Sequence, residues 1–364
     1  PNVVLIMMES MSAKFMKHFG QSETLTPFLD SLYTRSISFR NFYSAGIHTN
    51  HGLYATLYSF PAMMKRNLMK GSVIPRYSGL PTVLKENGYY NLFFMTHEGQ
   101  YDNMNAFFRT NGYDEVFSQE DYPADKVVNS FGVQDFLYDY AIPVLNQRAA
   151  TGQPFFATLL SISNHPPYVI PPFFHPKTSE PEMQIVEYAD WALRQFFEEA
   201  RKQPWFDNTI FVLEGDHGKL VGDAECELPE SYNHIPLMIY SSRIQPEEKT
   251  AFGGQVDIQP TILGLLNIDY LQNNFGVDLL KEERPCMFYT ADNMVVGRND
   301  TLLYLYNYET QQELTYDIGN GKLNAVPMDD SFLPLKEYSF SMLQSAEFLV
   351  KHGKTLNSIP FTQQ

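Results

Sequence analysis

Four residues of this 364-residue chain have the chemistry of a divalent metal site. Glu9 ends one apolar run of the sequence, and Asp216 and His217 follow another. Carboxylate oxygens combined with a histidine nitrogen are typical ligands of Zn²⁺ or Mn²⁺, and the histidine favours these ions over Mg²⁺, which stays a third option. Thr49 could add its hydroxyl as a fourth ligand. We therefore expect one divalent metal ion held by Glu9, Thr49, Asp216 and His217.

Thr49 also has the chemistry of a nucleophile, because it precedes a predicted helix that ends near Tyr58. A hydroxyl that binds a dication loses its proton more readily and can then attack phosphorus. The free N–H groups at the start of the helix can bind a phosphoryl oxygen. Taken singly, Glu9 fits a salt bridge, Asp216-His217-Gly218 a turn and Thr49 a helix cap. Their combination around one sheet favours catalysis.

The elements that must position these residues alternate between apolar strands and helices. Strands are expected at 3–8, 92–95, 155–161, 210–213 and 237–240, and helices at 27–33, 50–58, 81–88, 131–150, 182–201 and from 260 onward. This alternation predicts an α/β fold with a central, mostly parallel sheet and helices on both faces. Ligands of such sheets bind at the carboxyl ends of the strands, which is where Glu9 and Asp216 are placed.

The pattern of predicted elements changes near residue 284, from alternating strands and helices to a series of short strands. Short strands are expected at 287–289, 301–308 and 313–317, with a turn at 319–321 and a final helix at 335–351. We therefore divide the chain into a catalytic α/β domain, residues 1–283, and a small β-rich subdomain with a terminal helix, residues 284–364.

Composition excludes several classes of protein. The chain has 26 basic and 42 acidic side chains, a net charge of −16, which argues against nonspecific nucleic-acid binding but permits an anionic substrate beside a metal. Cys226 and Cys286 are its two cysteines, so a disulfide-rich scaffold and a cysteine zinc cluster are excluded, and one disulfide stays open. Aromatic residues are 15% of the chain, and most, such as Tyr101 and Phe107, are expected in the core.

Membrane attachment is not visible in the sequence itself. No apolar run approaches the roughly 18–20 residues that span a bilayer, and no signal peptide is recognisable. The chain begins at Pro1 and enters a strand almost at once. We therefore expect it to be a domain excised from a longer protein.

A set of ordered segments resembles the extracellular catalytic domain of lipoteichoic acid synthases and related phosphoglycerol transferases. These enzymes belong to the sulfatase-like branch of the alkaline phosphatase superfamily. The resemblance covers most of residues 1–280 and rests on NVVLIMMES at 2–10, the segment 25–29, the loop at Thr49, Ser163-Asn164-His165-Pro166, Gly215-Asp216-His217-Gly218 and the segment 256–263. It implies an alkaline phosphatase/sulfatase-like sandwich for the catalytic domain.

The resemblance also implies an activity. Glu9, Thr49, Asp216 and His217 match the metal ligands of the family, and Thr49 matches the threonine that becomes loaded with phosphoglycerol from a phospholipid donor. The acceptor is a hydroxyl of a glycan or of glycerol phosphate. His165 matches a histidine that contacts the substrate phosphate or the leaving group. Relatives are anchored in the cell membrane by N-terminal segments, with this domain outside the cytoplasm, extracellular or periplasmic.

Two departures from the family leave the headgroup open. The synthases carry a tryptophan and an arginine near the substrate, whereas residues 97–105 of this chain contain neither. His234 stands where the synthases have an arginine. We expect His97, Asp102, His165 and His234 to contact the substrate, although His234 could instead fill a structural hydrogen-bonding position.

Other functions compete with phosphoglycerol transfer. A phosphoethanolamine transferase or a phosphodiesterase could use the same threonine and metal. A sulfatase needs Cys or Ser in a C/S-x-P-x-R pattern, which neither Cys226 nor Cys286 provides. A non-catalytic sensor domain would not need the intact set of four ligands. The oligomeric state is left open.

Overall fold

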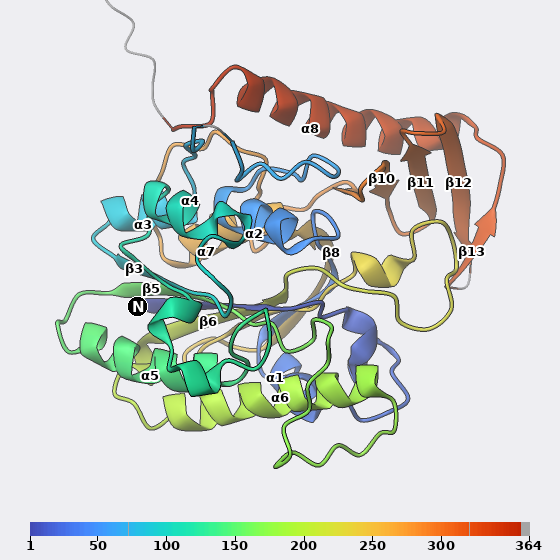
Figure 1. The fold of residues 1–364 in the computed structure, drawn as a ribbon. Coiled ribbons are helices and arrows are strands. Elements are labelled where there is room, and N and C mark those ends of the chain that lie inside the picture. Colours follow the sequence, from blue (N-terminus) through green and yellow to red (C-terminus); the bar gives the residue numbers. More distant parts are fainter. Residues whose placement is uncertain (72, 320, 358–364) are drawn as a thin grey trace, which may run out of the picture.

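Two β-sheets organise the chain in the computed structural model, which describes residues 1–71, 73–319 and 321–357 (Figure 1). The larger sheet has the strand order β4-β3-β5-β1-β6-β7-β2-β8. Its strands are β1 (Asn2–Met8), β2 (Ile37–Tyr43), β3 (Tyr90–Phe94), β4 (Glu115–Phe117), β5 (Phe155–Leu160), β6 (Thr209–Gly215), β7 (Leu237–Tyr240) and β8 (Glu247–Gly254). The predicted α/β architecture is confirmed.

Most neighbouring strands of this sheet are parallel. β1 lies between β5 and β6 and is parallel to both, while β7 runs antiparallel to β6 and to β2. Two antiparallel pairings in succession restore the direction, so β2 points the same way as β1 and β6. The carboxyl ends of β1, β2, β3, β5 and β6 therefore meet at one edge of the sheet.

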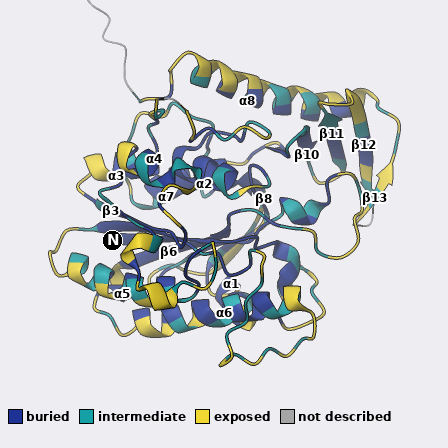
Figure 2. Ribbon diagram, in the orientation of Figure 1, coloured by how far each residue is buried: buried dark blue, intermediate teal, exposed yellow. Residues whose placement is uncertain are grey.

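Helices cover both faces of the larger sheet because its central strand is apolar throughout. Val3, Leu5 and Met7 belong to one core cluster, and Val4 and Ile6 belong to the opposite one. The first core is closed by α2 (Thr49–Tyr58), α3 (Leu80–Glu86), α4 (Met104–Thr110) and α7 (Ile258–Leu265), and the second by α1 (Pro27–Tyr33), α5 (Phe136–Ala149) and α6 (Pro181–Ala200). Figure 2 shows the sheet buried between these layers, with exposed residues on the outer sides of the helices.

The second sheet is antiparallel and follows in the chain. It has the order β13-β12-β11-β10-β9. Its strands are β9 (Met287–Thr290), β10 (Met294–Arg298), β11 (Leu302–Asn307), β12 (Gln312–Gly319) and β13 (Lys322–Ala325). The final helix α8 (Leu333–Lys351) packs on this sheet and extends over the α2 side of the molecule (Figure 1).

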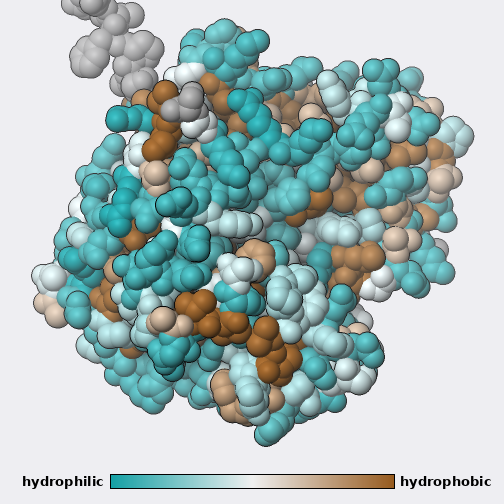
Figure 3. All heavy atoms as spheres, in the orientation of Figure 1, coloured by the Kyte–Doolittle hydropathy of each residue, from teal (hydrophilic) through white to brown (hydrophobic). Residues whose placement is uncertain are grey.

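The surface seen in this orientation is mostly hydrophilic, and apolar side chains form separate patches rather than one continuous area (Figure 3). This agrees with the acidic composition and with the burial of the apolar residues in the two cores of the larger sheet.

Some predicted elements differ from those observed. The helix expected at 131–150 begins only at Phe136, because Gly132 has a φ of +89° and accepts a hydrogen bond from the Val128 amide in a turn. Tyr101 was expected in the core and is 44% exposed, whereas Phe107 is buried as expected. The sequence patterns missed β2, β4, β8, β10, β13 and α4. The predicted turn at 319–321 includes residue 320, which lies outside the described residues.

Candidate active site

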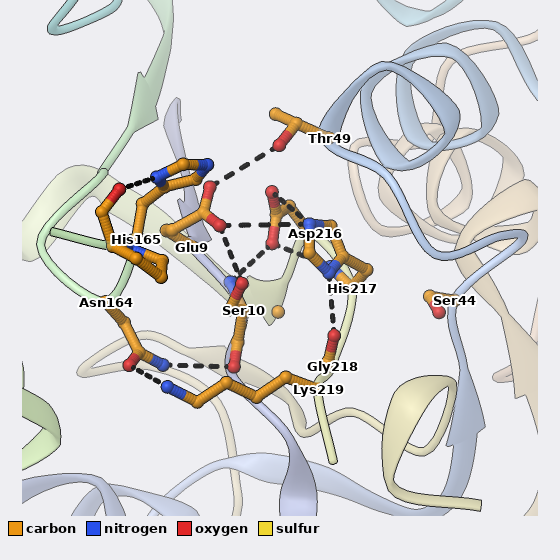
Figure 4. Close-up of polar contacts among 12 residues, drawn as sticks. Glu9, Ser10, Ser44, Thr49, Asn164, His165, Asp216, His217, Gly218 and Lys219 are labelled. Atoms are coloured by element: carbon orange, nitrogen blue, oxygen red, sulfur yellow. Dashed lines mark hydrogen bonds and ion pairs between the residues drawn. The ribbon is translucent and has the colours of Figure 1, made fainter. Parts of the chain in front are cut away.

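Two neighbouring strand ends bring three of the predicted metal ligands together. Glu9 follows β1, and Asp216 and His217 follow β6, which pairs directly with β1. One ligand atom from each of the three residues lies within 4.8 Å of the other two. His217 Nε2 is 3.8 Å from Glu9 Oε1 and 3.6 Å from Asp216 Oδ2. Figure 4 shows the three side chains turned toward one another.

The free atoms of this cluster fit a bound cation. Asp216 Oδ1 accepts hydrogen bonds from the Ser10 and His217 amides, at 2.8 and 2.7 Å. Asp216 Oδ2 is buried and has no hydrogen-bond partner among the described residues. His217 Nδ1 lies 2.7 Å from the Gly218 carbonyl, so it carries the proton and leaves Nε2 free as a ligand. A buried, unpaired oxygen beside a free imidazole nitrogen is what a divalent metal needs.

Electrostatics point the same way. Burial, and next the negative charge of Glu9, raise the pKa of Asp216 to about 7. Asp216 is fully buried and Glu9 is 2% exposed, so two carboxylates share a nearly water-free space. The repulsion between two such anions is relieved by a proton or by a cation. The donor set thus suits Zn²⁺ or Mn²⁺, with two oxygens and one nitrogen from these residues.

Thr49 lies at the start of α2, beside the cluster. It is the first residue of the helix, and His48 takes the cap position that we had considered for Thr49. The Thr49 hydroxyl donates to Glu9 Oε2 at 3.4 Å. Thr49 is the first residue of α2, so an anion bound to its hydroxyl lies near the positive end of the helix.

Close packing sets the position of α2 against the end of β6. A β-carbon on Gly52 would lie 2.2 Å from the Asp216 carbonyl oxygen, so only glycine permits this approach. The Gln255 amide donates to the same carbonyl at 2.8 Å, and its oxygen accepts from the Ala45 amide at 2.9 Å. Gln255 thereby joins the end of β6 to the loop that leads to Thr49.

Two of the predicted substrate residues lie along the edge of this site. His165 stands beside Glu9 in Figure 4, with its Nδ1 2.5 Å from the Pro166 carbonyl and its ring tilted against that of Phe131, 4.0 Å between centroids. His97 follows β3, is buried and packs on the ring of Tyr101 at 4.5 Å between centroids. Burial lowers the pKa of His97 to about 4, so its ring is neutral at pH 7.

The other two predicted substrate residues are engaged elsewhere. Asp102 pairs with Lys70 at 2.7 Å in the loop that also carries Tyr101. The ring of His234 stacks between Phe19 and Tyr43, and its Nε2 lies 2.8 Å from the Arg40 carbonyl. These contacts match the structural alternative considered for His234 and give no contact with the metal cluster.

Three polar residues that the sequence patterns did not single out complete the site: Ser10, Asn164 and Lys219. The Ser10 hydroxyl donates to Glu9 Oε1 at 2.6 Å. Asn164 donates to the Ser10 carbonyl at 3.0 Å and accepts from the Lys219 ammonium at 2.7 Å. Ser10 follows β1, Asn164 follows β5 and Lys219 follows β6. Glu9, His165 and His217 follow the same three strands. Their position after these strands, and for Ser10 and Asn164 their place in the family-like segments 2–10 and 163–166, are the signals that could have identified them.

Comparison with known proteins identifies the family. The Sulfatase family profile matches residues 1–268. The chain belongs to the Sulfatase family. Lipoteichoic acid synthase 1 of Bacillus subtilis (strain 168) is 25% identical over 350 residues, 88% of this chain and 53% of that protein. Lipoteichoic acid synthase 2 of the same strain is 24% identical over 315 residues, 78% of this chain and 47% of that protein. The chain spans about half the length of these curated relatives.

Solved structures share the fold. A protein of the alkaline phosphatase superfamily from Vibrio parahaemolyticus superposes with a TM-score of 0.87 at 27% identity, covering 97% of this chain and 88% of that chain. The lipoteichoic acid synthase LtaP from Listeria monocytogenes superposes with a TM-score of 0.82 at 21% identity, covering 96% and 92%. The predicted superfamily, its α/β fold and the assignment to a family of enzymes are confirmed.

Two further observations bear on the sequence-based expectations. Cys226 and Cys286 are both free thiols, so the disulfide that we left open is not formed. Within the described ranges, no helix is both long and apolar enough to cross a bilayer.

Proposed function

We propose that this chain is the catalytic domain of a metal-dependent phosphoglycerol-type transferase that acts on a phospholipid headgroup through a covalent phospho-threonine at Thr49. The observation that carries the proposal is the position of the Thr49 hydroxyl, 3.4 Å from Glu9 Oε2, at a helix start beside Glu9, Asp216 and His217. The similarity to lipoteichoic acid synthases supports phosphoglycerol as the transferred group.

Glu9, Asp216 and His217, with Thr49, would hold the divalent ion. When bound, Zn²⁺ or Mn²⁺ lowers the pKa of a coordinated hydroxyl and offsets negative charge on a phosphoryl group. The contribution of the chain is to fix Thr49 Oγ in front of the substrate phosphorus and to aim the free amides of α2 at the phosphoryl oxygens.

The transfer proceeds in two displacements at phosphorus. The Thr49 hydroxyl releases its proton to solvent and Oγ attacks, so that a phosphorus–oxygen bond to Thr49 forms and the bond to the diacylglycerol oxygen breaks. That oxygen needs a proton, and His165 is the partly exposed imidazole that stands beside Glu9 to supply it. An acceptor hydroxyl of a glycan or of glycerol phosphate then attacks the same phosphorus, the bond to Thr49 Oγ breaks, and Oγ regains from solvent the proton that it released. In this second displacement His165 takes the acceptor proton.

The headgroup would lie along the surface made by His97, Tyr101, Phe131 and His165. The neutral ring of His97 offers its Nδ1, which has no hydrogen-bond partner in the described part of the chain, and the partly exposed ring of His165 offers its Nε2. Hydroxyl groups of a glycerol headgroup can both donate to and accept from neutral imidazoles. Asp102 borders this surface and is the remaining predicted substrate residue near it. Its carboxylate pairs with Lys70.

Release of diacylglycerol from phosphatidylglycerol vesicles in the presence of Mn²⁺ tests this function. We expect Thr49→Ala to lower the rate at least about a thousandfold, because it removes the attacking atom, while Thr49→Ser keeps measurable turnover. Thr56→Ala, in the same helix but bonded to Glu214, is the matched control. Preferential release from phosphatidylethanolamine would instead support a phosphoethanolamine transferase. Normal rates in Thr49→Ala would overturn the nucleophile.

A further inference from the structure

Ser10 occupies an unusual position between the two carboxylates of the cluster. Its φ is +50°, in the left-handed region that residues other than glycine, asparagine and aspartate seldom adopt. This conformation turns the Ser10 amide toward Asp216 Oδ1, at 2.8 Å, and the Ser10 hydroxyl toward Glu9 Oε1, at 2.6 Å. One residue thus binds one oxygen of each acidic metal ligand.

The bonds that Ser10 makes decide which carboxylate oxygens stay free. Asp216 Oδ1 is satisfied by two amides, which leaves Oδ2 as its free, buried oxygen. Glu9 Oε1 accepts the Ser10 hydroxyl, and Oε2 faces Thr49. The two carboxylates are therefore fixed in rotation before any ion binds. Hydrogen bonds of this kind to metal-binding carboxylates orient them and tune affinity.

Two further side chains hold Ser10 in its conformation. Asn164 donates to the Ser10 carbonyl at 3.0 Å, and the Asn164 oxygen accepts from the Lys219 ammonium at 2.7 Å. Lys219 also donates to the Tyr168 hydroxyl at 3.0 Å and lies over the Phe15 and Tyr168 rings. Its ammonium thus points away from the cluster, toward Asn164, as Figure 4 shows.

This chain of contacts connects the loops that follow three different strands. Ser10 follows β1, Asn164 follows β5 and Lys219 follows β6, and all three are at least partly buried. Ser10 directly follows Glu9 and Lys219 lies two residues after His217, so both ends of the network are close in sequence to the proposed metal ligands. Because a left-handed backbone is unfavourable for serine, such a conformation persists only where its surroundings enforce it.

We infer that Ser10, held by Asn164 and Lys219, is a positioning residue that sets the affinity of the Glu9–Asp216–His217 site for its divalent ion. This rests on the proposed function only in that the cluster binds a metal. The network acts on the carboxylates through Ser10 and needs no contact with the substrate.

Isothermal titration calorimetry, in which Mn²⁺ alone is added to the metal-free protein, tests the inference. We expect Ser10→Ala, Ser10→Gly and Asn164→Ala each to raise the Kd for Mn²⁺ about 10- to 100-fold. Asn146→Ala, which removes a side chain bonded to Trp205 far from the cluster, should leave the Kd unchanged.

Ser10→Gly separates positioning from a purely structural role. Glycine adopts a positive φ without strain, so the melting temperature of the metal-free variant should equal or exceed that of the parent, while metal affinity falls. Lys219→Met removes the ammonium that binds Asn164, at a partly exposed position. It replaces Asn164→Ala as the test of the network if Asn164→Ala does not fold. A Kd within twofold of the parent in Ser10→Gly and Lys219→Met overturns the inference. A parent protein that binds no stoichiometric Mn²⁺ or Zn²⁺ overturns the proposed function as well.

Discussion

Asp216 is the residue of the proposed metal site whose protonation should compete with metal binding. Its pKa in the folded, metal-free protein is raised to about 7 from an ordinary value near 3.8, through burial and the charge of Glu9. The folded protein therefore retains a proton that the unfolded chain has already released. The contribution of Asp216 to the stability of the folded protein is therefore present at low pH and is lost as the pH rises through about 7.

A metal ion reverses this trend because it replaces the proton. We expect the metal-free protein to melt at a lower temperature at pH 8 than at pH 6, and Mn²⁺ to raise the melting temperature more at pH 8. The apparent Kd for Mn²⁺ should rise about tenfold per pH unit below pH 7, as one proton competes with the ion. Thermal melts with chelator or with Mn²⁺ at both pH values measure this. A larger shift at pH 6 would contradict it, and Asp216→Asn is the control that removes the titrating group.

Helix α2 carries Thr49, the proposed nucleophile, and its position depends on one glycine. Gly52→Ala would normally favour a helix by about 1 kcal/mol. Here the new methyl group would meet the Asp216 carbonyl at 2.2 Å, so α2 must move away from β6. We expect a loss of about 1–3 kcal/mol in the free energy of unfolding, measured with urea, together with weaker Mn²⁺ binding.

A second glycine in an ordinary environment provides the comparison. A β-carbon on Gly319, in β12, would come no closer than 3.4 Å to its nearest neighbour. Gly319→Ala should therefore leave both stability and metal affinity near the parent values. Equal effects of the two substitutions would contradict the account of how α2 is positioned.

The strands that end at the site were predictable because they are short apolar runs bounded by polar residues. The predicted bounds of β1, β5 and β6 lie within two residues of the observed ones. The positions of Glu9 and Asp216 after β1 and β6 were therefore predictable too. β8 was missed because its first half, residues 247–250, is polar and mostly exposed at the edge of the sheet. An edge strand needs only one apolar side, so its sequence carries a weaker signal.

The supporting residues of the site could not be read from the sequence. The role of Ser10 depends on a left-handed backbone and on the direction of a main-chain amide, neither of which residue type reveals. Asn164 and Lys219 meet only because the ends of β5 and β6 lie on either side of β1. His234 illustrates the converse, since its position in the sequence suggested the substrate while its ring packs on Phe19 and Tyr43.

At the scale of the whole molecule, buried polar contacts join the second sheet to the first part of the chain. Arg284 donates from Nε to Asp257 Oδ2 at 2.8 Å and from Nη1 to the Tyr338 hydroxyl of α8 at 2.8 Å. Its side chain is 2% exposed, and that of Asp257 is 0% exposed. Thr290 of β9 donates its amide to Ala45, in the loop that leads to Thr49, at 2.9 Å. The proposed domains 1–283 and 284–364 therefore depend on each other for burial.

This interdependence predicts the result of breaking the buried pair. Arg284→Met leaves the Asp257 carboxylate buried without its cation, and we expect the free energy of unfolding to fall by about 3–5 kcal/mol. Lys281→Met, which removes an exposed partner of Asp278, should cost at most about 1 kcal/mol. Both proteins should unfold in one transition in urea. Two separate transitions in the parent would show that the second sheet is an independent unit.

The identity of the group bound to Thr49 during turnover tests the central claim most directly. With enzyme in excess over phosphatidylglycerol and Mn²⁺ present, rapid acid quenching should trap a phosphoglycerol adduct on the tryptic peptide 41–65, and fragmentation should locate it on Thr49. The adduct should be absent from Thr49→Ala and from protein treated with chelator. Diacylglycerol release without an adduct at any quench time would show that water or the acceptor attacks phosphorus directly, and would contradict the account.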